Sequence, residues 1–306
     1  MRPTNPASHR RWRPGYPVSL RVLLGLHRKG PGDPTHAVET TGRWWRTART
    51  PDGPGTLAVA VEQDEVAASA WGPGAAWLLE HLPDWLGASD DLAGFRPTHA
   101  VLRDGARRLG GPRVGRTGLV MEALLPAILE QKVTGGESRR AWRALVRRFG
   151  EPAPGPVTGL LVVPTPQEWQ AIPSWEWHRA GVGPQRAATC VRAAAVAARL
   201  EQAGSMPPDQ ADVRLRAVPG VGAWTSAEVR ARALGDPDAV SVGDAHVPRL
   251  ITYALTGEVS DSDEVMLDAL GPYRGHRYRV QRTLELSGVK APRFGPRYAP
   301  HDFRAM

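Results

Sequence analysis

The spacing of hydrophobic residues changes near residue 95, and this change predicts a chain of two parts. Before it, short alternating runs separated by Pro, Gly and Asp predict antiparallel strands over 17–23, 42–47, 57–61 and 66–71. Leucines then recur at helical spacing, which predicts one helix over 71–86. We therefore expect a small α+β domain over residues 1–94, and we expect its first 16 residues to form a basic, Pro-rich solvated tail.

Beyond Phe95 the strand pattern largely stops and helical spacing takes over. Residues 119–132 are apolar on almost every side, as expected for a buried central helix. Further helices are expected over 97–109, 138–149, 166–171, 175–180, 183–202, 209–217, 224–234, 244–255, 261–270 and 273–286. The prediction is a mainly α protein, with a helical domain over 95–288 and a C-terminal tail at 289–306.

The composition limits the kinds of partner and the kinds of metal site or disulfide that the protein can have. The 306-residue chain has a formal net charge of +8, which favours an anionic partner. Cys190 is its single cysteine, which excludes an intrachain disulfide, a Cys-ligated zinc site and a four-Cys iron–sulfur cluster. The sequence has neither a signal-peptide core nor an apolar run of membrane-spanning length. We expect a soluble, cytoplasmic protein with no membrane partner.

One stretch, residues 215–227 (Leu-Arg-Ala-Val-Pro-Gly-Val-Gly-Ala-Trp-Thr-Ser-Ala), predicts two helices joined by a tight turn. Pro219 disfavours a helical conformation at the residue before it. Gly220 and Gly222 are expected to supply the unusual dihedrals of the turn. A helix N-terminus with unpaired N–H groups binds anions such as phosphate. Alone, this pattern also fits a plain helical corner.

Four motifs, together with the hairpin, resemble in their order those of the helix-hairpin-helix DNA glycosylases, most closely the 3-methyladenine glycosylase II type. Residues 128–134 (Ile-Leu-Glu-Gln-Lys-Val-Thr) resemble the end of a family helix, and 181–187 (Gly-Val-Gly-Pro-Gln-Arg-Ala) resemble a helix start. The Pro-Gly-Val-Gly hairpin follows, and then 244–249 (Asp-Ala-His-Val-Pro-Arg). The start of the last helix, at 272–277, resembles the alkylbase branch. The resemblance implies a bilobal helical core and an enzyme of base-excision repair.

The resemblance places the family's catalytic carboxylate at Asp244, although alone it would be read as a capping residue. A fixed carboxylate stabilises the positive charge that develops on the sugar when an N-glycosidic bond breaks, and it positions water. Family members with lyase activity have a lysine at the position of Trp224, and no other lysine lies within forty residues of the hairpin. Hydrolysis by water is therefore expected. The Trp224 ring is expected to stack on a cationic base.

The resemblance also assigns binding residues. Gly220, Val221, Gly222 and Thr225 would hold DNA phosphates, and Gln131 or Lys132 would fill the gap left by the flipped base, although Lys132 departs from the family's apolar wedge. Tyr273, Trp44 and Trp45 are candidates for the base pocket, with core packing as the alternative for each. Arg10, Arg11 and Arg13 are candidates for DNA contacts. A structural Na⁺ or K⁺ would lie on the main-chain carbonyls of Arg216, Val218 and Val221; no redox or organic cofactor is implied.

The predicted function is that of a monomeric, monofunctional DNA glycosylase acting on alkylated purines in double-stranded DNA. Two alternatives remain. The first is an oxidised-base or mismatch glycosylase, because residues 244–247 (Asp-Ala-His-Val) resemble the endonuclease III branch. The second is a catalytically silent protein that binds lesions. We expect Arg249 to pair with a neighbouring carboxylate, and His246 to have a structural role.

Overall fold

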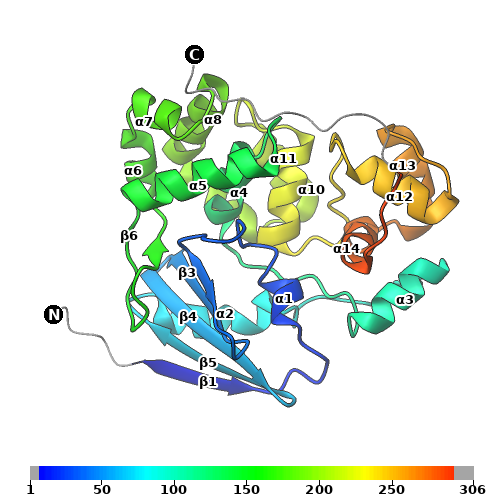
Figure 1. Cartoon of the computed structure of the whole chain (residues 1–306), viewed down its shortest axis with the longest axis horizontal. Coiled ribbons are helices and arrows are strands. Elements are labelled where there is room, and N and C mark those ends of the chain that lie inside the picture. Colours follow the sequence, from blue (N-terminus) through cyan, green and yellow to red (C-terminus); the bar gives the residue numbers. More distant parts are fainter. Residues whose placement is uncertain (1–6, 293–306) are drawn as a thin grey trace.

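The computed structural model of the chain describes residues 7–292. Its N-terminal part is a five-stranded antiparallel sheet in the order β1-β5-β4-β3-β2. The strands are β1 (Ser8–Trp12), β2 (His36–Val38), β3 (Trp44–Thr50), β4 (Gly53–Glu62) and β5 (Glu65–Trp71). The helices α1 (Leu20–Leu23) and α2 (Ala75–Trp85) contribute leucines to the same buried cluster as one face of the sheet. Figure 1 shows this sheet at one end of the molecule.

The sheet confirms the strands predicted over 42–47, 57–61 and 66–71, and the helix over 71–86 becomes α2. The strand predicted over 17–23 is wrong, because Leu20, Leu23 and Leu24 instead use helical spacing to reach the core. The prediction of a solvated tail is wrong for Ser8–Trp12, which forms the edge strand β1 and pairs with β5. Residues 1–6 lie outside the described part.

Two of the arginines proposed for DNA contacts lie in β1 and have partners within the N-terminal domain. The Arg10 guanidinium donates to the carbonyl oxygens of Leu79 (2.7 Å) and Glu80 (3.2 Å). Arg11 Nη1 donates to Glu65 Oε2 at 2.5 Å, on the neighbouring strand. Both side chains therefore hold the N-terminal domain together, and a DNA contact by Arg10, Arg11 or Arg13 stays a prediction.

The rest of the described chain is helical, and its buried residues form two main clusters. The first lobe contains α4 (Val120–Leu129), α5 (Gly135–Phe149), α6 (Pro166–Ala171), α7 (Ser174–Arg179), α8 (Pro184–Ala195), α9 (Ala197–Glu201), α10 (Pro208–Arg216) and α11 (Ala223–Val229). A π-helical turn, η2 (Arg230–Leu234), continues α11. The second lobe contains α3 (Ala100–Arg108), α12 (Val247–Thr256), α13 (Asp263–Ala269) and α14 (Arg277–Ser287). Figure 1 shows this lobe beside α10 and α11.

Short structures complete the chain: 3₁₀ turns lie at Gln202–Ser205 and Gly271–Tyr273, and β6 (Glu151–Pro152) pairs with β7 (Leu161–Val162). The predicted fold class, mainly α and bilobal with a small α+β domain, is confirmed. Residues 293–306 of the predicted tail lie outside the described part. No helix among residues 7–292 has the length and apolar character that a membrane crossing needs.

The central helix α4 is buried along its whole length, as the sequence predicts, and its two ends are fixed by other helices. At its N-terminus no local side chain caps it; instead the Glu201 carboxylate accepts from the N–H groups of Val120 (2.8 Å) and Met121 (2.9 Å). At its C-terminus Arg186 Nη1 donates to Leu129 O at 2.8 Å. These contacts fix the loop that follows α4, where Gln131 and Lys132 lie.

Candidate active site

The turn between α10 and α11 is a tight hairpin that packs against α8. Gly220 has a φ of 99°, and a Cβ there would come within 2.2 Å of Thr189 Oγ1, so only glycine fits. Gly222 has an extended conformation (φ −94°, ψ −175°) with open space at its Cβ position. The expectation of unusual dihedrals is therefore confirmed for Gly220 and wrong for Gly222.

The unpaired N–H groups of this hairpin are fewer than the motif suggests. Val221 N donates to Val218 O at 2.9 Å, so its N–H has a partner within the hairpin, and a phosphate contact through Val221 stays a prediction. Among residues 7–292, the N–H groups of Gly220 and Gly222 have no hydrogen-bond partner, and both residues are exposed. These two groups are available to an anion at the start of α11.

Gln131 fastens the loop after α4 to the hairpin. Its Nε2 donates to Gly220 O at 2.9 Å and to Thr225 Oγ1 at 2.8 Å. Thr225 is only 2% exposed, so its hydroxyl lies within the protein, and the predicted phosphate contact stays a prediction. Gln131 therefore sets the relative position of two chain segments that lie almost ninety residues apart.

Asp244 and Trp224 meet on the other side of α11. Trp224 Nε1 donates to Asp244 Oδ2 at 3.0 Å. The other carboxylate oxygen, Oδ1, accepts from the backbone N–H groups of His246 (2.7 Å) and Val247 (3.0 Å) at the start of α12. Both side chains are half-buried, so the carboxylate is oriented by three donors and still reaches the surface.

The loop that carries Asp244 has a support that the sequence did not reveal. The carboxylate of Asp263, at the start of α13, accepts from the N–H of Gly243 at 2.9 and 3.1 Å. In the sequence Asp263 has the pattern of an ordinary acidic residue in a helix's first turn, so no signal distinguishes it. Arg249 pairs with Asp261 at 2.8 Å, which confirms the predicted ion pair.

The structural comparisons agree on one fold. The 3-methyladenine DNA-glycosylase from Archaeoglobus fulgidus superposes with a TM-score of 0.77 at 19% identity, over 91% of this chain and 98% of that one. The 8-oxoguanine glycosylase/lyase from Clostridium acetobutylicum gives 0.71 at 13% identity, over 93% and 99%. This chain has the helix-hairpin-helix DNA glycosylase fold. No family model and no curated protein matches the sequence.

The structure of the Clostridium enzyme in complex with double-stranded DNA containing 8-oxoguanine opposite cytosine has the same fold. It gives a TM-score of 0.68 at 11% identity, over 92% of this chain and 97% of that one. The fold that this chain shares with the Clostridium enzyme therefore accommodates DNA in that enzyme. At such low identities, the likeness shows the fold alone.

Within this glycosylase fold, Lys132 lies nearer the hairpin than the sequence suggests. It is exposed, and its φ of 52° places it in the left-handed region that non-glycine residues seldom adopt. Its neighbour Gln131 contacts Thr225, the residue after Trp224. Lys132 thus directly follows a residue that contacts the hairpin, and its role as a wedge stays a prediction.

The aromatic side chains proposed for the base pocket lie mostly in the core. Tyr273 is 2% exposed, its hydroxyl contacts Thr98 and His99, and it packs in the second lobe. Trp44 and Trp45 are buried in the N-terminal domain. These positions favour the core-packing alternative, and a role of these side chains in the base pocket stays a prediction. Trp224 is the one predicted pocket aromatic that the structure places beside Asp244.

The carbonyl groups predicted to hold a monovalent cation are compatible with that role. Arg216 is the last residue of α10, and helix-terminal carbonyls have no partner within their own helix. Val218 O accepts from Val221 N at 2.9 Å, and a carbonyl oxygen has a second lone pair. The oxygens of Arg216, Val218 and Val221 thus suit a hard cation, which stays a prediction.

Proposed function

We propose that this protein is a monofunctional DNA glycosylase that hydrolyses the N-glycosidic bond of alkylated purines in double-stranded DNA. The observation that carries the proposal is the 3.0 Å hydrogen bond from Trp224 Nε1 to Asp244 Oδ2, beside a helical hairpin. It places one carboxylate and one electron-rich ring together at the surface of a protein with the glycosylase fold.

Asp244 is proposed as the catalytic residue. Cleavage of the bond between C1′ and the base nitrogen leaves the bonding electrons on the base and positive charge on the sugar. A carboxylate close to C1′ stabilises this charge, and it accepts a proton from the water that attacks C1′. Three N–H donors orient the carboxylate before substrate binds, so little reorganisation is needed during the reaction.

Trp224 is proposed to favour a cationic leaving group. Alkylation at a purine ring nitrogen gives the base a positive charge, and an indole ring attracts cations at its face. Such a base departs without prior protonation, which agrees with a site built around one carboxylate. An indole cannot act as the amine nucleophile of a lyase, so the abasic product keeps an intact strand.

Double-stranded DNA is the proposed partner. The exposed N–H groups of Gly220 and Gly222 are placed to bind one phosphate, since helix N-termini attract anions. The net charge of +8 adds attraction that does not depend on the base sequence. Lys132, at the exposed turn after α4, is the proposed residue for the gap left by the flipped base. We propose that the protein acts as a monomer in the cytoplasm, with a monovalent cation under the hairpin.

The deciding experiment measures base release from methylated duplex DNA by wild type and Asp244→Asn. We expect wild type to release 3-methyladenine and to leave strands that break only after alkali. Asp244→Asn should bind the same DNA and release no base. Asp261→Asn is the matched control, because this exposed carboxylate pairs with Arg249 on the same lobe and lies outside the site.

Three outcomes would overturn the proposal in different ways. Release of oxidised or mismatched bases alone would identify an oxidised-base or mismatch glycosylase. Tight binding of lesions without release of any base would identify a silent lesion-binding protein. Strand cleavage without alkali that disappears in Lys132→Gln would show that the exposed amine acts as a lyase nucleophile.

A further inference from the structure

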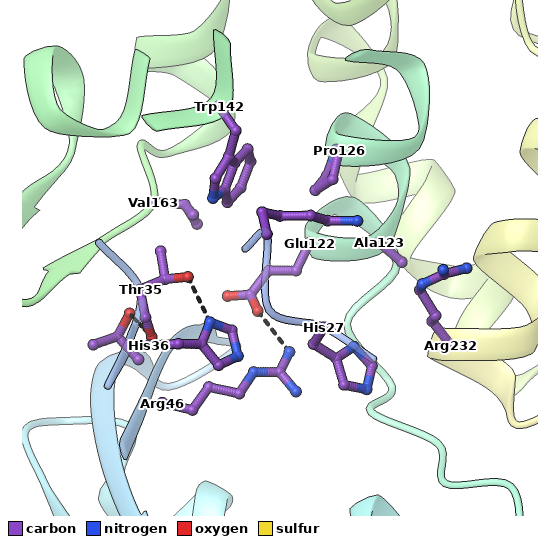
Figure 2. A pocket seen from close by; sticks show the side chains of 12 residues that line it. His27, Thr35, His36, Arg46, Glu122, Ala123, Pro126, Trp142, Val163 and Arg232 are labelled. Carbon is purple, nitrogen blue, oxygen red and sulfur yellow. Dashed lines mark hydrogen bonds and ion pairs between the residues drawn. The ribbon is translucent and has the colours of Figure 1, made fainter. Parts of the chain in front are cut away.

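A small cavity, lined by both charged and apolar side chains, lies between the N-terminal sheet and the first helical lobe. It has a volume of about 20 Å³, which is room for one or two guests of the size of water. Figure 2 shows His36 and Arg46 reaching it from the sheet, Glu122 from α4 and Arg232 from η2. We call it the seam cavity; its other lining residues are His27, Lys29, Thr35, Thr47, Ala123, Pro126, Trp142 and Val163.

The charges that face the seam cavity are mostly positive. Lys29, Arg46 and Arg232 line it, whereas Glu122 is its one lining carboxylate. Two of these cations have carboxylate partners outside the lining: Lys29 pairs with Glu130 at 2.9 Å, and Arg232 pairs with Glu228 at 2.6 Å. Arg46 pairs with Glu122, so each of the three lining cations has a carboxylate partner, and the cavity offers a guest unpaired N–H groups rather than net positive charge.

Arg46 is incompletely paired although it is only 4% exposed. Its Nη2 donates to Glu122 Oε2 at 3.2 Å, and its guanidinium stacks on the Trp85 ring at 4.2 Å. Within the described residues its Nε and Nη1 have no hydrogen-bond partner, and Arg232 Nε has none either. Buried N–H donors without acceptors are costly, and arginine cannot relieve that cost by losing a proton.

The protonation of His36 determines which ring nitrogen faces a guest as a donor. Thr35 Oγ1 donates to Asp33 Oδ1 at 2.8 Å, so it accepts from His36 Nδ1, 2.9 Å away. The proton of the imidazole therefore lies on Nδ1, and Nε2 is left without a partner among residues 7–292. In this neutral ring Nε2 is an acceptor, and it becomes a donor to an anion only when the ring takes up a second proton, which burial disfavours by lowering the pKa of His36.

We propose that the seam cavity binds one small inorganic anion of about the size of chloride, held by the unpaired N–H groups of Arg46. The anion accepts hydrogen bonds from donors that have no acceptor among the protein atoms of the described residues. Its site joins the sheet to α4 and η2, so it stabilises the contact between the N-terminal domain and the first lobe. This site is separate from the proposed DNA face and does not depend on the proposed function.

The test uses the full chain and compares chloride with gluconate, an anion too large for the cavity, at constant ionic strength. Chloride should raise the Tm of wild type by about 2 °C in a saturable manner. Arg46→Lys keeps the positive charge beside Glu122 and removes the guanidinium donors, so the chloride response should disappear. Arg140→Lys, an exposed substitution on α5, is the matched control and should keep the response.

Crystals of wild type grown with bromide give a second, independent measurement. An anomalous peak within hydrogen-bond distance of Arg46 Nε or Nη1 is expected. A cavity that holds only a water molecule, with no anomalous signal, would overturn the proposal. An equal response of wild type and Arg46→Lys to chloride would also overturn it, since the ion would then bind elsewhere. Wild-type crystals decide the matter even if Arg46→Lys fails to fold.

Discussion

Trp224→Phe separates the two roles that the structure gives to Trp224. The substitution removes the N–H that donates to Asp244 Oδ2 at 3.0 Å and keeps an aromatic ring at the site. The other two donors to the carboxylate bind Oδ1 only, so Oδ2 loses its single protein partner among the described residues. Asp244 then rotates more freely about its side-chain bonds and meets C1′ less often in the reactive orientation.

The size of the effect follows from the hydrogen bond. A bond to a charged group contributes roughly 1.5–3 kcal/mol. The lower value applies here, because Asp244 is half-buried and water can replace the lost donor. About 1.4 kcal/mol corresponds to a factor of ten in rate. We therefore expect the rate constant for base release to fall about tenfold in Trp224→Phe.

Single-turnover release of 3-methyladenine from methylated duplex DNA measures this step without interference from product dissociation. Trp224→Ala should be slower than Trp224→Phe, since it removes the ring as well. Trp175→Phe is the control, because Trp175 is an exposed tryptophan on α7 outside the site. A wild-type rate in Trp224→Phe would refute the idea that the indole N–H orients the carboxylate.

Three further predictions concern stability. Gly220→Ala should cost more than about 2 kcal/mol in unfolding free energy, because φ is 99° and the new Cβ meets Oγ1 and Cγ2 of Thr189. Thr189→Ala removes both atoms, so urea denaturation that finds Thr189→Ala/Gly220→Ala no better than additive would contradict relief of a clash. Lys132→Gly should raise the free energy of unfolding by up to about 1 kcal/mol, because glycine adopts the left-handed conformation of residue 132 without strain. An unchanged midpoint of urea denaturation would speak against strain at Lys132. Burial, with neighbouring cations, lowers the pKa values of His27 and His36, so the folded state binds fewer protons than the unfolded state below pH about 6.5. The free energy of unfolding in chloride-free buffer should be full above that pH and should fall as the pH falls to 5.5. If His27→Gln shows the same dependence of stability on pH, His27 does not contribute to it.

Local sequence patterns determined which segments of this protein form helices and which form strands. Helical spacing in the second half, short alternating strands before it, and turn residues between them fixed the type of most elements. Such patterns suffice because a helix or strand must turn its apolar face to the core wherever that core lies. The exceptions were short: four residues at Leu20–Leu23 and five at Ser8–Trp12 were too few to show a period.

The hairpin was visible in the sequence because its chemistry is local. Gly220 needs a positive φ, and Pro219 limits the residue before it, whatever the rest of the chain does. The candidate Asp244 came from motif order and a resemblance, and it would otherwise look like a capping residue. Its two backbone partners, His246 and Val247, are in fact typical of a cap.

Only the tertiary structure decided which long-range neighbours these residues have. It brought Trp224 to Asp244, Gln131 to the hairpin, and Asp263 to the loop of Gly243. It also placed Tyr273 in the core rather than in a pocket. No periodicity encodes such contacts, because they join segments twenty to ninety residues apart whose distance depends on how the helices pack. The sequence determines which side chains can do chemistry, and packing determines which of them meet.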